Sequence, residues 1–181
     1  AVPEGFAPKC LDPFGGVPFR VEETRKLAVD DTVLRRVAGA ELPRGPLAVA
    51  RDLFLFSFYC RGMSFVDMAY LRQGDIEGDV IRYRRRKTGQ LFTVRIIPPL
   101  RAILDRYREI CSPLALPILM VKDGRGGFCP FELSGTDPAR KRLSEQEQYK
   151  RYLQNRSEFL HHLRRLSRLL GLERSLTFNM A

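Results

Sequence analysis

The sequence lacks the residues on which several kinds of functional site depend. It contains no tryptophan, two histidines and four cysteines. The cysteines lie far apart and form no C-x-x-C pair, which favours reduced thiols over a disulfide framework or a zinc site. The histidines, His161 and His162, are adjacent and would point about 100° apart on a helix, so one helix face cannot present both to a metal. We therefore expect neither a metal site nor a cofactor.

Long hydrophobic runs are also missing. No run reaches the roughly 18 apolar residues that a membrane span needs, and no secretory signal opens the chain. The most apolar stretch, residues 46–59, is interrupted by Arg51 and Asp52. The sequence thus predicts no contact with a membrane. It begins with Ala1 rather than methionine, which indicates a cut or processed N-terminus.

Positive charge is abundant and comes mainly from one residue type. Lys and Arg total 31 against 21 Asp and Glu, a formal net charge of +10, and 25 of the 31 are arginine. The planar guanidinium presents paired donors that match phosphate oxygens, whereas lysine is a point charge. This composition favours a nucleic-acid partner, and the alternative is a basic protein whose charge serves only solubility.

The order of local signals predicts an α+β fold that is mostly helical. Residues 1–24 carry four prolines and three glycines and indicate the end of a preceding domain and a linker, so residues 25–181 form the expected domain. Helices are predicted at 31–38 (N-cap Asp30 or Asp31), 47–59, 65 to 71 or 72, 98–110 and 145–170. Strands at 80–86 and 91–97 form a hairpin with a possible third strand at 75–77, while residues 112–142 are expected to be loop-rich.

Two of these helices carry a capping box at their start. Ser64 with Asp67, and Ser144 with Glu147, have the spacing at which each side chain caps the backbone N–H of the other. The second box opens the long helix, whose apolar residues recur at helical spacing and are expected to face the core. They are Tyr149, Leu153, Phe159, Leu160, Leu163, Leu166 and Leu170.

The predicted hairpin concentrates the positive charge. Six cations and no acid lie between residues 82 and 95: Arg82, Arg84, Arg85, Arg86, Lys87 and Arg95. Strand alternation places Arg82, Arg84 and Arg86 on one face and Arg85 on the other. Such a ribbon is suited to contact the phosphates of a DNA duplex, and the alternative is a solvated surface hairpin.

Three segments in this order resemble the catalytic domain of the tyrosine recombinases (phage-integrase family), in the branch of bacterial conjugative and mobilisable elements. They are residues 52–71 (DLFLFSFYCRGMSFVDMAYL), 74–76 (GDI) and 84–90 (RRRKTGQ). Residues 176–181 resemble the start of the second signature box of the family, and residues 1–20 the end of its core-binding domain. The resemblance, over about 25–181, implies an enzyme that cuts and rejoins double-stranded DNA through a 3′-phosphotyrosine. It implies a tetramer on DNA in the bacterial cytoplasm.

The resemblance also implies roles for single residues. Lys87 lies where the family has the hairpin lysine that protonates the leaving 5′-oxygen. Ser64 stands where the family has its first phosphate-binding arginine, so we expect Arg61 to replace that arginine, with Arg51 as the second choice. Asn179 falls where the family has His or Lys.

The chain ends one residue before the expected second arginine, and none of its tyrosines matches the nucleophile. By this resemblance the chain is a truncated catalytic domain that is inactive alone. A non-catalytic DNA-binding module with the same fold is the main alternative. A basic RNA-binding domain is a third reading, which requires stacking aromatics on an open sheet, where the hairpin offers Tyr83 and Phe92.

Overall fold

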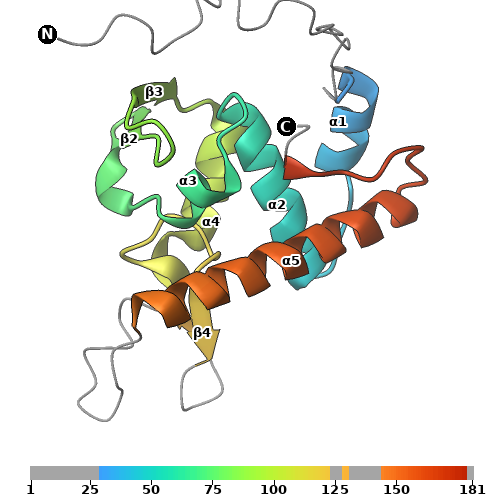
Figure 1. The fold of residues 1–181 in the computed structure, drawn as a ribbon. Helices are drawn as coiled ribbons and strands as arrows, with labels where there is room; N and C mark the ends of the chain where they lie inside the picture. The colour runs from blue at the N-terminus through green and yellow to red at the C-terminus, as the bar shows by residue number, and fades with distance from the viewer. Residues whose placement is uncertain (1–28, 123–127, 131–143, 179–181) are drawn as a thin grey trace, which may run out of the picture.

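The computed structural model describes residues 29–122, 128–130 and 144–178. Along the chain these residues form α1 (Asp31–Ala38), α2 (Pro46–Tyr59), α3 (Phe65–Ala69), the 3₁₀ turn η1 (Gln73–Asp75), β1 (Ile76–Glu77), β2 (Val80–Arg84), β3 (Leu91–Arg95), α4 (Pro98–Cys111), β4 (Met120–Lys122), β5 (Phe128–Pro130) and α5 (Glu145–Leu169). Helices with a small antiparallel sheet confirm the expected class at this coarse level (Figure 1). The linker at 1–24 and the position of Asn179 lie outside the described residues, so the domain boundary stays a prediction.

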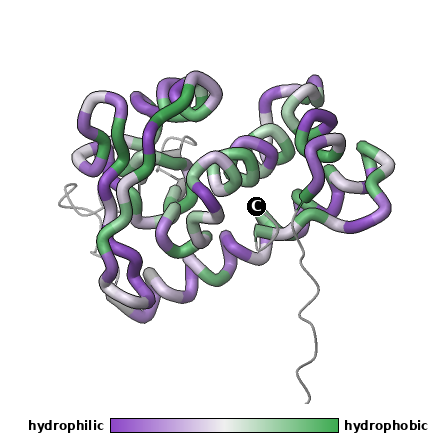
Figure 2. The backbone as a smooth tube through the Cα atoms, turned by 90° about the horizontal axis from the view of Figure 1, so that it is seen from above, coloured by the Kyte–Doolittle hydropathy of each residue, from purple (hydrophilic) through white to green (hydrophobic). Residues whose placement is uncertain are grey.

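Helix α2 forms the centre of the core. Leu53, Phe54 and Phe56 are completely buried, as expected for a helix that is apolar on nearly every side. Helix α5 crosses α2, and Leu163 and Leu166 are buried there (Figure 1). Figure 2 shows hydrophobic and hydrophilic stretches alternating along the described residues, and the buried residues of α1, α2, α3, α4 and α5 and of β2 and β3 belong to one core cluster. No helix in the described ranges has the length and hydropathy to cross a membrane.

The expected inward face of α5 is wrong in its N-terminal half. Tyr149 is 59% exposed and Leu153 is 41% exposed, although both have helical spacing with the buried leucines. The fully buried positions, Leu163 and Leu166, lie in the C-terminal half. In that half, Tyr152 and Asn155 face the rest of the protein instead, so the predicted stripe holds only from Phe159 onward.

The three-stranded sheet has the order β1-β2-β3 and is antiparallel throughout, as expected. Ile81 pairs with Val94 and Tyr83 with Phe92, and this face turns toward the core. The arginines of β2 and β3 lie on the other face, which is exposed. The predicted strands were too long: β2 ends at Arg84, and residues 85–90 form the turn.

Two other segments differ from expectation because distant residues pair with them. The helix predicted to reach Leu71 or Arg72 ends at Ala69. The Ala115 N–H donates to the Leu71 carbonyl over 2.9 Å, and Arg72 pairs with Leu114, so the chain is extended there. Part of the region expected to be loop-rich forms the two-stranded sheet of β4 and β5.

Candidate nucleic-acid interface

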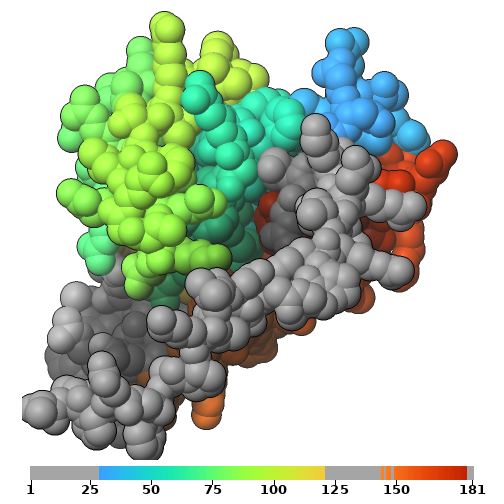
Figure 3. Space-filling model, turned by 45° about the horizontal axis from the view of Figure 1, so that its top comes forward, coloured from blue at the N-terminus to red at the C-terminus, as the bar shows by residue number. Residues whose placement is uncertain are grey.

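Arginine side chains occupy the exposed face of the β2–β3 hairpin. Register places Arg82 opposite Thr93, Arg84 opposite Leu91 and Arg95 opposite Val80, all on this face. The yellow-green atoms of the hairpin stand at one end of the molecule in Figure 3, with blue α1 at the other. The charge is partly neutralised by a residue outside the hairpin, because Arg82 forms an ion pair of 2.7 Å with Glu77 of β1. Arg84 and Arg95 therefore carry most of the unneutralised charge of the exposed face.

Arg85 and Arg86 belong to the turn instead of the strand, so the predicted common face of Arg82, Arg84 and Arg86 is wrong beyond Arg84. The turn is closed by two backbone hydrogen bonds: Gly89 donates to the Arg85 carbonyl over 2.7 Å, and Arg85 donates to the Gln90 carbonyl over 2.8 Å. The Arg85 guanidinium lies over the Phe92 ring at 5.4 Å, and that of Arg86 lies over the Tyr70 ring at 3.9 Å.

A buried carboxylate fixes this turn to the start of α3. Asp67 is 4% exposed, and its Oδ1 accepts a 2.8 Å hydrogen bond from the backbone N–H of Arg86. Its Oδ2 accepts a 2.6 Å bond from the Ser64 hydroxyl and lies 3.9 Å from Arg85 Nε. A buried carboxylate requires such donors to offset its desolvation. Asp67 thus joins residues 64–67 to the turn that carries Lys87.

The predicted capping box at this helix is only half present. The Ser64 hydroxyl accepts from the Asp67 N–H over 3.3 Å, which confirms its N-cap role. The Asp67 carboxylate was expected to accept from the Ser64 N–H, but it binds the Ser64 hydroxyl and the Arg86 N–H instead. The link to the hairpin, 19 residues away, was not predicted.

Lys87 follows Arg86 directly and is exposed at the turn. Its ammonium makes no hydrogen bond or ion pair with the part of the chain that the structure describes. The backbone before it is held by Asp67, whereas its side chain extends into solvent. Lys87 is therefore available to a ligand that approaches the hairpin.

Arg61 adopts a backbone conformation that arginine rarely takes. Its φ is +58°, and it stands just beyond the C-cap Cys60 of α2. The Gly62 N–H donates to the Ser57 carbonyl and the Arg61 N–H to the Phe58 carbonyl, each over 2.9 Å, which is the Schellman pattern. The position that glycine usually fills is thus held by an arginine whose side chain is exposed.

Helix α5 ends in the same pattern with the usual residue. Gly171 has a φ of +57°. The Leu172 N–H donates to the Ser167 carbonyl over 2.9 Å and the Gly171 N–H to the Arg168 carbonyl over 3.0 Å. The chain therefore contains two equivalent helix ends, one with glycine and one with Arg61.

Arg51 is engaged inside the protein. Its guanidinium donates to Asp52 Oδ1 from Nε over 3.0 Å and from Nη2 over 2.9 Å, and to the Ala40 carbonyl over 2.7 Å. Asp52 is 1% exposed and also accepts from Arg106 and, over 2.8 Å, from the Tyr107 hydroxyl. Burial, with the Asp52 charge, raises the pKa of Tyr107 well above its ordinary value. Arg51 thus neutralises a buried carboxylate, whereas the Arg61 side chain is exposed.

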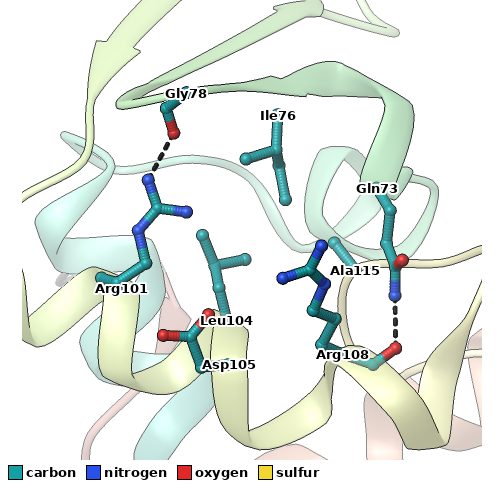
Figure 4. A pocket seen from close by; sticks show the side chains of 8 residues that line it. All are labelled: Gln73, Ile76, Gly78, Arg101, Leu104, Asp105, Arg108 and Ala115. Atoms are coloured by element: carbon teal, nitrogen blue, oxygen red, sulfur yellow. Dashed lines mark hydrogen bonds between the residues drawn. The ribbon is translucent and has the colours of Figure 1, made fainter.

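A polar hollow of about 270 Å³ lies elsewhere, between α4 and the segment from η1 to β1 (Figure 4). Arg101, Asp105 and Arg108 line it together with Ile76 and Leu104. Arg101 is already bound to Asp79 over 2.9 Å. None of the residues predicted to act on DNA lines this hollow, so the candidate interface is the hairpin and its turn.

Comparison with known proteins gives a weak likeness. No family model matches the sequence, and no curated protein matches it. A solved structure described as a lambda integrase tetramer bound to a Holliday junction aligns with a TM-score of 0.39 and 17% identity. The alignment covers 88% of this chain and 41% of that one, so this chain spans less than half the length of its structural neighbour. A likeness at this level assigns no function.

Proposed function

We propose that this chain binds double-stranded DNA through the exposed face of the β2–β3 hairpin and its turn. The observation that carries the proposal is the exposed arginine face at a turn that Asp67 holds in place. Among the residues that the structure describes, Arg84, Arg95 and Lys87 form no ion pair. Neutralising phosphates with such side chains releases counterions, which supplies most of the affinity for a duplex. The net charge of +10 also attracts polyanionic DNA from a distance.

We further propose that the protein to which this chain belongs is a site-specific tyrosine recombinase that cuts and rejoins DNA through a 3′-phosphotyrosine. Arg61 would bind a non-bridging phosphate oxygen, and Lys87 would protonate the leaving 5′-oxygen. Asn179 would donate a hydrogen bond, whereas Ser64 would stay the N-cap of α3 with its hydroxyl proton bound to Asp67. A tetramer on DNA in the bacterial cytoplasm belongs to this proposal.

The backbone of Arg61 supports a role beyond packing. An L-residue in the left-handed region costs about 1–2 kcal/mol, and such strain concentrates at functional sites. Gly171 shows that the chain uses glycine at the equivalent end of α5. An arginine at this position is explained by a ligand for its exposed guanidinium.

The second candidate is a DNA-binding module without catalysis. The contacts of Ser64 favour this module, because the Ser64 hydroxyl already donates to Asp67 and caps α3. A module that stacks RNA bases on its sheet is disfavoured, because Tyr83 is 8% exposed and its ring stacks on Phe92 at 5.6 Å on the inner face. Burial, as the main cause, also raises the pKa of Tyr83 to about 12.

A salt titration tests duplex binding. If about five phosphates are neutralised, the logarithm of the binding constant should fall against log[salt] with a slope of roughly −4 to −5. The double variant Arg84→Ala/Arg95→Ala should reduce the magnitude of this slope by about two. The matched control Arg35→Ala/Arg164→Ala, which removes the same charge from α1 and α5, should keep the slope. A flat titration, or equal effects of the two double variants, would contradict the proposal.

Trapping of a covalent adduct separates the two candidates. In the intact protein, a suicide DNA substrate should accumulate a protein–DNA adduct, and Arg61→Ala should slow its formation by about 10²–10³. Ser64→Ala should mainly lower stability, by about 1 kcal/mol for a lost N-cap. Absence of any adduct from the intact protein would favour the non-catalytic module.

A further inference from the structure

A row of planar side chains runs from the hairpin turn to α5, and we call its four members the aromatic row: Arg86, Tyr70, Tyr152 and Tyr149. The Arg86 guanidinium lies 3.9 Å from the centroid of the Tyr70 ring. The Tyr70 and Tyr152 centroids are 6.4 Å apart at 33°, and those of Tyr152 and Tyr149 are 6.2 Å apart at 25°. The Tyr149 and Tyr152 rings are stacked, whereas the Tyr70 and Tyr152 rings are tilted against each other.

Local structure explains how the row forms. Tyr149 and Tyr152 are three residues apart on α5 and so lie on one helix face. Tyr70 follows the last residue of α3, and the Arg86 backbone is fixed by Asp67. Phe65 lies 5.8 Å from the Tyr152 ring and supports the middle of the row from the core side.

Both ends of the row are open. Tyr149 is 59% exposed and Arg86 is exposed, whereas Tyr70 and Tyr152 are half-buried. Burial raises the pKa of Tyr152, as expected for a ring covered by its neighbours. The outer ring, Tyr149, is mostly exposed and so gains little from burial.

Three cations accompany the row, and the Asp67 carboxylate also acts on Tyr152. Lys87 follows Arg86, Lys150 follows Tyr149, and the charge of Arg156 acts on Tyr152. The Arg86 guanidinium uses its face to stack, which leaves the N–H donors on its edge for phosphate oxygens. Aromatic rings combined with cations are the means by which proteins bind single nucleic-acid strands.

We propose that the aromatic row is a stacking site for an unpaired base of a DNA strand, next to the duplex that the hairpin binds. The inference rests on the proposed duplex binding and adds a second kind of contact. Every base presents a π face, so the site would not depend on sequence. The outer face of Tyr149 receives the base, and Lys150, the next residue, binds a flanking phosphate. Arg86, at the other end of the row, contacts the strand where it joins the duplex.

The test compares two DNAs that differ only in one unpaired base. The 181-residue chain should bind a duplex with a single extrahelical base about tenfold more tightly than the fully paired duplex. Tyr149→Ala should abolish this preference and leave affinity for the paired duplex unchanged. Tyr149→Phe should retain the preference, and Leu169→Ala, which truncates an exposed side chain at the far end of α5, should also retain it.

The outcomes separate this inference from the proposed function. No binding of the paired duplex would overturn the proposed function. Normal binding of the paired duplex without preference for the unpaired base would overturn the stacking site alone. Retention of the preference by Tyr149→Ala would also overturn it, and would leave the row as packing between α3 and α5.

Discussion

Replacement of Arg61 by glycine should stabilise the protein. The φ of +58° costs an L-residue about 1–2 kcal/mol, and glycine avoids this cost. Glycine also makes the unfolded chain more flexible, which offsets about 0.4–1 kcal/mol. The net gain is about 0.5–1 kcal/mol in the free energy of unfolding. For a chain of this length, that gain should raise the melting temperature by about 1–4 °C.

Gly171 allows the opposite substitution at the equivalent helix end. It occupies the same position at the end of α5, and a Cβ there would meet only the Arg36 guanidinium at an ordinary distance of 3.7 Å. Gly171→Ala should therefore lower the free energy of unfolding by about 1 kcal/mol through backbone strain alone. Urea denaturation of the wild type and both variants measures the two changes under one set of conditions.

The two substitutions should change the free energy of unfolding in opposite directions. Arg61→Gly should be more stable than the wild type yet bind duplex DNA more weakly, since the exposed guanidinium is lost. A less stable Arg61→Gly would show that the side chain of Arg61 stabilises the fold, and the argument from strain would be refuted.

Three further predictions concern buried polar groups. Asp67→Ala should cost about 2–3 kcal/mol in urea denaturation, because the Arg86 N–H loses a charged acceptor, and it should weaken duplex binding as the turn loosens. Arg51→Ala should cost about 1–3 kcal/mol by leaving Asp52 with fewer donors, with unchanged affinity for DNA in a binding titration. Burial lowers the pKa of His162 below 6.5, so the unfolded chain binds its proton more readily. The free energy of unfolding should therefore be fully retained above pH 6.5 and should decrease as the pH is lowered below 6.5. In His162→Gln this decrease should be smaller.

Local signals predicted the parts of the fold that local contacts determine. Asp30 caps α1 by accepting from the Val33 N–H over 2.8 Å, and Ser144 with Glu147 forms the full capping box of α5. The continuous burial of α2 followed from its composition. Such features depend on residues within one or two turns, and the sequence displays those residues directly.

The parts that were missed depend on residues far apart in the chain. Alternation could not show that β2 ends at Arg84, because the Arg86 N–H is taken by a carboxylate of α3. The spacing of Tyr149 and Leu153 on α5 could not show that Tyr152 is the residue that packs against the core there. The candidate site was predicted as a charged hairpin. The contact of Asp67 with the hairpin turn and that of Arg51 with Asp52 could be seen only in the tertiary structure. The one sequence signal at Asp67 was its place in a predicted capping box.

Photo-crosslinking tests the central claim, that the hairpin face contacts the duplex, most directly. A duplex with photoreactive bases should crosslink the full chain at residues 82–95, identified by mass spectrometry of the digested adducts. Crosslinks should decrease in Arg84→Ala/Arg95→Ala and remain in Arg35→Ala/Arg164→Ala. Crosslinks confined to α1 or the C-terminal half of α5, with none in the hairpin, would contradict the account.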